Sequence, residues 1–191
     1  MRSSISQTNR SIQRMCGQLL KLRPWHQVRT IANHGKFVVV RQKNAELAKL
    51  AYGGNYDQVM EAPVTIALFT DTDLQRRARK IARVGGVQNF TEEQLQYFMQ
   101  NLPAEYARYN EQQISDYLAL NAGLVAMNLV LALTDQGIGS NIILGFDKSK
   151  VNEVLEIEER FRPELLITVG YAAEKVEPSY RLPVDEIIEK R

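Results

Sequence analysis

The sequence predicts an α+β fold built around one long, buried helix. Apolar runs rich in β-branched residues at 37–41, 64–69 and 165–171 indicate strands. Residues 104–136 are predicted to form a helix whose second half carries apolar side chains on nearly every side, which is typical of a helix buried all round. With 191 residues and 45% hydrophobic content, the chain can bury one substantial core.

The elements before the long helix follow in order from the first strand. The strand at 37–41 ends in charge and precedes a short predicted helix at 45–51. The strand at 64–69 is followed by Asp71–Asp73, whose carboxylates could suggest metal ligands. We interpret this segment as the N-cap of the next helix, which runs through Arg77–Arg83 with a basic outer face.

A further helix is predicted to begin at Thr91, because Thr-Glu-Glu-Gln is a capping sequence. The side chains predicted to point inward from this helix are Leu95, Phe98, Met99 and Leu102. After the long helix, a short helix at 148–155 and the strand at 165–171 complete the pattern.

The distribution of cysteine and histidine excludes several kinds of enzyme. The only cysteine is Cys16 and the only histidines are His26 and His34, so residues 37–191 contain neither type. This part of the chain therefore has no Ser-His-Asp or Cys-His nucleophile, no plausible zinc site and no disulfide framework. We assign no catalytic side chain and no metal ligand, and an enzyme of this composition would rely on a cofactor for its chemistry.

The most informative stretch follows the long helix. It reads Gly-Ile-Gly-Ser-Asn-Ile-Ile-Leu-Gly-Phe-Asp at 137–147, and Ser-Tyr-Arg-Leu-Pro-Val-Asp-Glu follows at 179–186. Gly137 suits the left-handed residue that ends many helices, so by itself the stretch could be only a C-cap. It is not a dinucleotide fingerprint, which follows a strand, opens a helix and needs a third glycine where Ile142 stands.

The order of these segments resembles the FMN-dependent nitroreductase family over roughly residues 37–190. The resemblance implies an α+β nitroreductase-like fold, with a mixed, mainly antiparallel sheet, helices on both faces and a central buried helix at a dimer interface. In that family the predicted region around Phe98 covers the flavin, so it could form a lid instead of core. The dimer interface would build both flavin sites.

The resemblance also implies a set of cofactor-binding residues. The backbone of Ile142, Ile143, Leu144 and Gly145 would lie against the isoalloxazine ring, with Gly145 allowing close approach. Asn55 falls where the family binds the flavin pyrimidine edge, and Gln58 falls where many members carry a lysine. An alternative for both is a plain turn, since Gly-Gly-Asn is common turn chemistry.

Arg181 lies where the family supplies a basic group to the FMN phosphate, and a guanidinium can make bidentate contacts with phosphate oxygens. The alternative is a surface arginine paired with Glu177 or Asp185. The family's second cation in this tail is replaced here by Ser179.

The implied function is an FMN-dependent oxidoreductase that passes hydride from NAD(P)H to an electron-poor acceptor such as a nitroaromatic or a quinone. The expected partners are a second copy in a homodimer and the small-molecule acceptor, with no nucleic acid and no membrane, and the expected location is cytoplasmic. One alternative uses the same fold for dehalogenation or flavin breakdown. Another is a non-catalytic or degenerate flavin-binding paralogue, and a third is nucleic-acid binding through a basic N-terminal arm.

Residues 1–36 differ in charge from residues 37–191. The first segment carries +7 with no acidic residue, whereas the second has 17 basic against 22 acidic residues. We expect an atypical N-terminal segment at 1–36 and a flavin-binding domain at 37–191. A mitochondrial-type presequence, a basic arm for nucleic acid or anionic membrane, and a shifted reading frame would each give this pattern.

We favour the shifted frame. The nitroreductase pattern has Ala-Pro-Ser-x-x-Asn-x-Gln-Pro-Trp immediately before a strand like 37–41, and residues 26–36 permit that motif when their codons are read one base earlier. The gene tests this directly: the alternative frame upstream of codon 37 should encode Pro-Ser and Gln-Pro-Trp. A stop codon or any other peptide there would contradict the hypothesis and favour a presequence.

Overall fold

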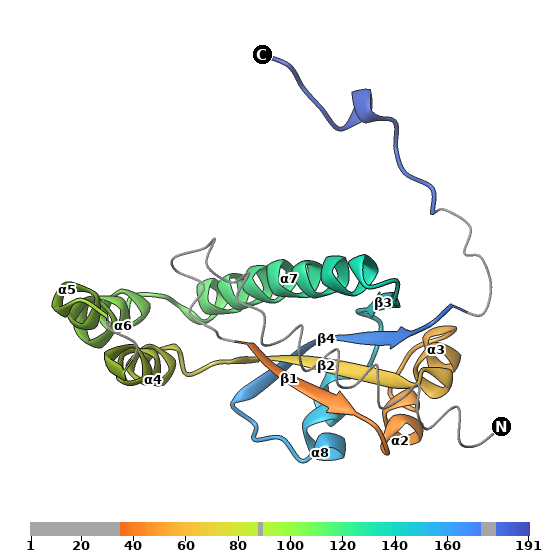
Figure 1. Ribbon diagram of the computed structural model, residues 1–191, viewed down its shortest axis with the longest axis horizontal. Helices are drawn as coiled ribbons and strands as arrows, with labels where there is room; N and C mark the ends of the chain where they lie inside the picture. Colours follow the sequence, from red (N-terminus) through yellow and green to blue (C-terminus); the bar gives the residue numbers. More distant parts are fainter. Residues whose placement is uncertain (1–34, 88–89, 173–178) are drawn as a thin grey trace.

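The computed structural model describes residues 35–87, 90–172 and 179–191. Its centre is a four-stranded sheet with the order β1-β2-β4-β3 (Figure 1). The strands are β1 (Gly35–Val40), β2 (Val64–Asp71), β3 (Gly139–Ile143) and β4 (Phe161–Gly170). Every pairing among these four strands is antiparallel, which agrees with the predicted, mainly antiparallel α+β architecture.

Helices lie on both faces of the sheet and beyond one of its ends (Figure 1). The long helix α7 runs along one face, α2 and α8 lie on the other, and α3 sits near the end where β3 begins. The helices are α2 (Asn44–Ala48), α3 (Asn55–Glu61), α4 (Leu74–Val87), α5 (Glu92–Gln96), α6 (Leu102–Tyr106), α7 (Glu111–Asp135) and α8 (Val151–Leu155). A π-helical turn η2 (Tyr97–Asn101) and two 3-10 turns, η3 (Lys148–Lys150) and η4 (Val184–Glu186), complete the described elements.

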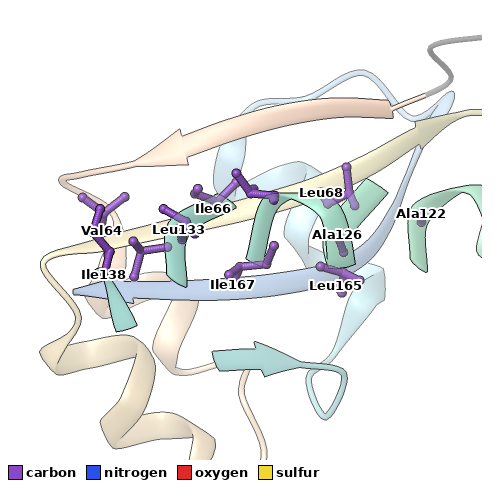
Figure 2. Close-up of a cluster of buried hydrophobic side chains, with 11 residues drawn as sticks. Val64, Ile66, Leu68, Ala122, Ala126, Leu133, Ile138, Leu165 and Ile167 are labelled. Atoms are coloured by element: carbon purple, nitrogen blue, oxygen red, sulfur yellow. The ribbon is translucent and has the colours of Figure 1, made fainter. Parts of the chain in front are cut away.

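The two faces of the sheet follow from the alternation of side chains along its central strands. Figure 2 shows Val64, Ile66 and Leu68 of β2 beside Leu165 and Ile167 of β4, on the face that α7 covers. The α7 side chains buried in this cluster are Ala122, Ala126, Leu129 and Leu133. On the opposite face, the intervening residues pack against α2, α3 and α8; they include Ala67, Phe69 and Leu166. All eight residues of β2 are buried, so this strand is the centre of the fold.

The long helix differs from its prediction at its start. A helix from about residue 104 was expected, but α6 ends at Tyr106 and α7 begins only at Glu111. Asn110 causes the new start, because its side chain accepts a hydrogen bond of 2.8 Å from the backbone N–H of Gln113. Gln113 in turn accepts from the Asn110 backbone at 2.9 Å, which completes a capping box.

The prediction that this helix is buried all round is wrong for the single chain. The large apolar α7 residues that remain exposed are Leu120, Leu124, Met127 and Leu131, with 65%, 45%, 48% and 56% of their surface accessible. They are spaced by four, three and four residues, so they form one stripe opposite the face that packs on the sheet. We call these four residues the α7 stripe.

The length and apolar character of α7 would by themselves allow it to cross a membrane, although no membrane is expected as a partner. This is weak evidence for a membrane span, because the core helix of a soluble protein passes the same test. Here Ala122, Ala126, Leu129 and Leu133 bury one side of the helix against the sheet.

The helices α4, α5, α6 and the turn η2 form a lobe at the end of the sheet away from α3 (Figure 1). The lobe has its own buried cluster, in which Leu74, Leu102 and Tyr106 meet Leu118 of α7. The capping box at Thr91 is confirmed. Leu102 points inward as predicted, whereas Met99 is 49% exposed, contrary to prediction.

Polar contacts fix the elements at this end of the sheet. Asp73 caps α4 by accepting from the Arg76 backbone at 2.8 Å, which confirms the N-cap interpretation. The buried Asp71 instead pairs with Arg160 at 2.9 Å. From β4, Arg162 donates to the Ser115 hydroxyl at 2.7 Å, so the start of α7 is tied to the strand that it covers.

A close contact at the end of β4 gives a test of this packing. A Cβ added at Gly170 would lie 2.9 Å from two ring carbons of Pro63, which cannot move as the tip of a flexible side chain could. We expect Gly170→Ala to lower the free energy of unfolding by about 1–3 kcal/mol, the usual cost of overpacking. Gly54→Ala is the control, because a Cβ at Gly54 meets nothing within 4 Å. Equal denaturation midpoints for the two variants would contradict the packing.

Candidate functional site

The candidate site begins where α7 ends. Gly137 has a φ of 71°, in the left-handed region, as predicted for a helix C-cap. The following amide of Ile138 donates back to the carbonyl of Leu133 at 3.0 Å. The chain then enters β3, an edge strand that includes Ile142 and Ile143 and that was not predicted from the sequence. Their side chains pack at the two faces of the sheet, which leaves backbone and the exposed Asn141 for other contacts.

Gly145 is held by two donors from the segment that leads into α3. Its carbonyl accepts from the backbone N–H of Tyr52 at 2.9 Å and from the side-chain amide of Asn55 at 3.1 Å. A Cβ on Gly145 would lie 2.9 Å from the Asn55 amide nitrogen. A side chain at this position would displace the Asn55 amide, so the glycine permits the close approach of this protein amide. The expected approach of the Gly145 backbone to a flavin ring stays a prediction.

A second contact joins the same two elements. The side-chain amide of Asn141, on β3, donates to the amide oxygen of Gln58, on α3, at 2.5 Å. Gln58 lies one helical turn after Asn55, so both side chains project from one face of α3 toward β3 and the segment after it. We call the two contacts, Asn55–Gly145 and Gln58–Asn141, the α3–β3 seam.

Apolar side chains border the seam. Leu144 is 66% exposed, Tyr52 is 60% exposed and Tyr56 is 39% exposed. Among the backbone hydrogen bonds that the described loops and turns make, none is donated by Leu144 or Gly145. Amide groups beside exposed aromatic and aliphatic surface suit a flat ring system that carries carbonyl and imide groups along one edge.

The two elements that form the seam, α3 and β3, carry no basic residue. No lysine or arginine occurs at 50–75 or at 109–147, while Asp57 and Glu61 of α3 are exposed. Just after the seam, the hydroxyl and backbone N–H of Ser149 lower the pKa of Asp147 by hydrogen bonding to its carboxylate. The Asp147 backbone also donates to the Leu50 carbonyl at 2.8 Å, which fixes the far end of the segment.

The structure brings six of the seven predicted site residues together and leaves the seventh apart. Asn55, Gln58 and the segment 142–145 meet at the seam. Arg181 lies on the C-terminal arm, residues 179–191, which extends away from the sheet (Figure 1). Its guanidinium donates to the carbonyl of Tyr180 at 2.9 Å. The alternative partner Glu177 lies outside the described residues.

Sequence reasoning missed two contributors. Asn141 was part of the quoted stretch but received no role, because no strand was predicted there. The period-two alternation of a strand would have placed Asn141 on the same face as the buried Ile143 and hence toward α3. The Tyr52 backbone donor carries no sequence signal, since any residue other than proline supplies an N–H.

Comparisons with known proteins agree with this architecture. The model of the nitroreductase family matches residues 21–171. The match includes residues 21–36, which we expected to lack the family pattern; residues 1–34 lie outside the described part of the structure, and the shifted frame stays a prediction.

Individual relatives are similar over most of their length. Spy0809 of Streptococcus pyogenes serotype M6, provisionally named an NAD(P)H nitroreductase, is 62% identical over 82% of this chain and 78% of its own. A nitroreductase family protein from Streptococcus pneumoniae superposes with a TM-score of 0.89 at 77% identity, covering 93% of this chain and 89% of that chain.

A more distant structure has the same fold. A provisionally named nitroreductase from Exiguobacterium sibiricum, solved in complex with FMN, superposes with a TM-score of 0.80 at 22% identity, covering 95% of this chain and 86% of that chain. Because the family match spans most of the sequence and similar proteins share its fold, this chain belongs to the nitroreductase family of oxidoreductases.

Proposed function

We propose that this chain is an FMN-dependent oxidoreductase that passes hydride from NAD(P)H to an electron-poor acceptor, such as a nitroaromatic or a quinone. The observation that carries the proposal is the α3–β3 seam, where Asn55 and the Gly145 peptide meet just after the end of β3. The names of relatives such as Spy0809, and the FMN in the structure from Exiguobacterium sibiricum, support the choice of cofactor and electron donor.

The residues at the seam fit a flavin. The backbone amides of Leu144 and Gly145 supply donors, the free oxygen of the Asn55 side chain supplies an acceptor, and Gln58 supplies a further N–H₂ group. When bound, FMN supplies the hydride and electron transfer, so no side-chain acid, base or nucleophile is required. The protein orients the ring, and the Tyr52 and Asn55 bonds to Gly145 hold the peptide in place before the cofactor arrives.

The first test is spectroscopic. Purified protein titrated with FMN should turn yellow, quench the flavin fluorescence, and then oxidise NAD(P)H in the presence of a nitroaromatic acceptor. If the gene carries the shifted motif, the same assay is also run on the frame-restored protein. We propose residues 37–191 as the flavin-binding domain, and we expect the restored loop to strengthen FMN binding. A colourless protein that does not respond to added FMN would contradict the proposal.

We propose that Arg181 contacts the FMN phosphate once the C-terminal arm has folded back or joined a second copy. In support, Arg181 is exposed, and within the described arm its guanidinium donates to the neighbouring Tyr180 carbonyl. The arm also exposes Tyr180 and Leu182, at 82% and 53%, so apolar surface beside the arginine is available for docking.

The phosphate role predicts a difference between two ligands. Arg181→Ala should weaken FMN binding about ten- to a hundredfold, because a charge-assisted contact contributes about 1.5–3 kcal/mol, and should barely affect riboflavin. Arg191→Ala is the control, since Arg191 lies on the same arm and pairs with Glu189. Equal losses for FMN and riboflavin would show that Arg181 acts structurally instead.

We propose that two copies pair through the α7 stripe in a homodimer. The stripe has the four-three-four spacing of a helix-pairing seam, and Gly123 beside it has open space around its Cα. A two-fold pairing of antiparallel α7 helices sets the start of one helix beside the end of the other. It would therefore bring the lobe of one copy toward the α3–β3 seam of its partner.

The same pairing accounts for the apolar length of α7 without a membrane. We therefore propose a cytoplasmic protein that uses neither a membrane nor a nucleic acid as its partner. In support, one side of α7 packs on the sheet and the other is a narrow stripe instead of an apolar surface all round.

A charge in the α7 stripe should separate the copies. Leu124→Glu should raise the dimer dissociation constant at least about a hundredfold, because a central interface residue contributes about 2 kcal/mol or more and a buried unpaired charge adds to the cost. Ala45→Glu on α2, which lies on the face of the sheet opposite α7, is the control for the added charge. Sedimentation that shows the same oligomer for Leu124→Glu as for wild type would contradict the proposed interface.

A further inference from the structure

The contact between Gln58 and Asn141 has a property that the rest of the seam lacks. Both side chains are exposed, so their hydrogen bond competes with water and contributes little to folding. The bond nevertheless fixes the orientation of the Gln58 side-chain amide. Because the Gln58 oxygen accepts from Asn141, its nitrogen occupies the other branch of the amide and remains available as a double donor.

We propose that Asn141 is a positioning residue of the cofactor site: it holds the Gln58 amide with its N–H₂ group toward the ligand, so that neutral donors meet the pyrimidine edge of FMN. This inference rests on the proposed flavin function. It adds Asn141 to the cofactor site, and it assigns neutral donors to the part of the site that faces the pyrimidine edge of FMN.

The seam has no cation of its own to add to these donors. Neither α3 nor β3 contains a lysine or arginine, and the nearest charges along the α3 sequence are the carboxylates of Asp57 and Glu61. A positive charge beside the pyrimidine edge would favour reduced over oxidised FMN, because reduction places negative charge on that part of the ring. A neutral amide at this position stabilises oxidised and reduced FMN to more similar extents.

The amide pair should behave as one unit. Asn141→Leu removes the donor and keeps a side chain of similar size, and we expect it to raise the FMN dissociation constant about three- to tenfold. Gln58→Leu should lose at least as much affinity, because it removes the proposed ligand donor itself, and the double variant should bind FMN no more weakly than Gln58→Leu, because Asn141 acts only through Gln58. Additive losses would show that the two residues act separately and would overturn the proposal.

The orientation of the Gln58 amide has its own test. In Asn141→Asp the carboxylate can only accept, so the Gln58 N–H₂ must turn toward it and the amide oxygen must face the ligand. FMN affinity should then fall further than in Asn141→Leu, and Asn141→Gln, which can still donate, should recover part of it. Equal affinity in the aspartate and leucine variants would overturn the proposed orientation.

The neutral edge is tested by the redox midpoint potential. Gln58→Lys should tighten reduced relative to oxidised FMN about tenfold, which raises the potential by about 30 mV for a two-electron couple. Glu159→Gln, which changes the net charge by the same amount at an exposed turn before β4, should leave the potential unchanged. An unchanged potential in Gln58→Lys would show that residue 58 does not face the ring.

These outcomes separate the two proposals. If the wild-type protein binds no FMN, both the proposed function and the clamp are wrong. If it binds FMN and Asn141→Leu binds with the same affinity and potential, only the clamp is wrong.

Discussion

Burial of one side of α7 against β2 and β4 is the interaction on which the rest of the structure depends. The side chains of Ala122, Ala126, Leu129 and Leu133 fill the face of the sheet that Ile66 and Ile167 present. This packing fixes the point at which the helix ends, and Gly137 then turns the chain directly into β3. The position of Gly145 follows from the helix, the turn and the antiparallel register of β3 with β4.

The candidate site is thus built on rigid elements. Gly145 follows an edge strand, and the donors that hold its carbonyl come from Tyr52 and the first turn of α3. A peptide held in this way can present its N–H groups with little reorganisation, which is the condition for tight and specific cofactor binding. The same arrangement leaves the α7 stripe and the C-terminal arm without partners in the single chain, and a second copy can cover both.

Much of the fold could be predicted from the sequence, because apolar periodicity and caps are local signals. The strands β2 and β4, the capping box at Thr91 and the C-cap at Gly137 are examples. The break before α7 was missed, since Asn110 acts through a side-chain contact that competes with a continuous helical pattern. Full burial of α7 was wrongly inferred because apolar residues facing solvent or a second copy look the same in one sequence.

The meeting of Asn55 with Gly145 was predictable only through family resemblance, and the Gln58–Asn141 contact depends on a register that no local pattern reveals.

The most direct test of the account is a crystal structure of the protein grown with FMN. The account predicts that the polar edge of the ring lies within hydrogen-bond distance of Asn55 and Gln58, with the Gly145 peptide against the ring and the Asn141–Gln58 bond intact. FMN bound elsewhere on the chain, with the α3–β3 seam open to solvent, would contradict it.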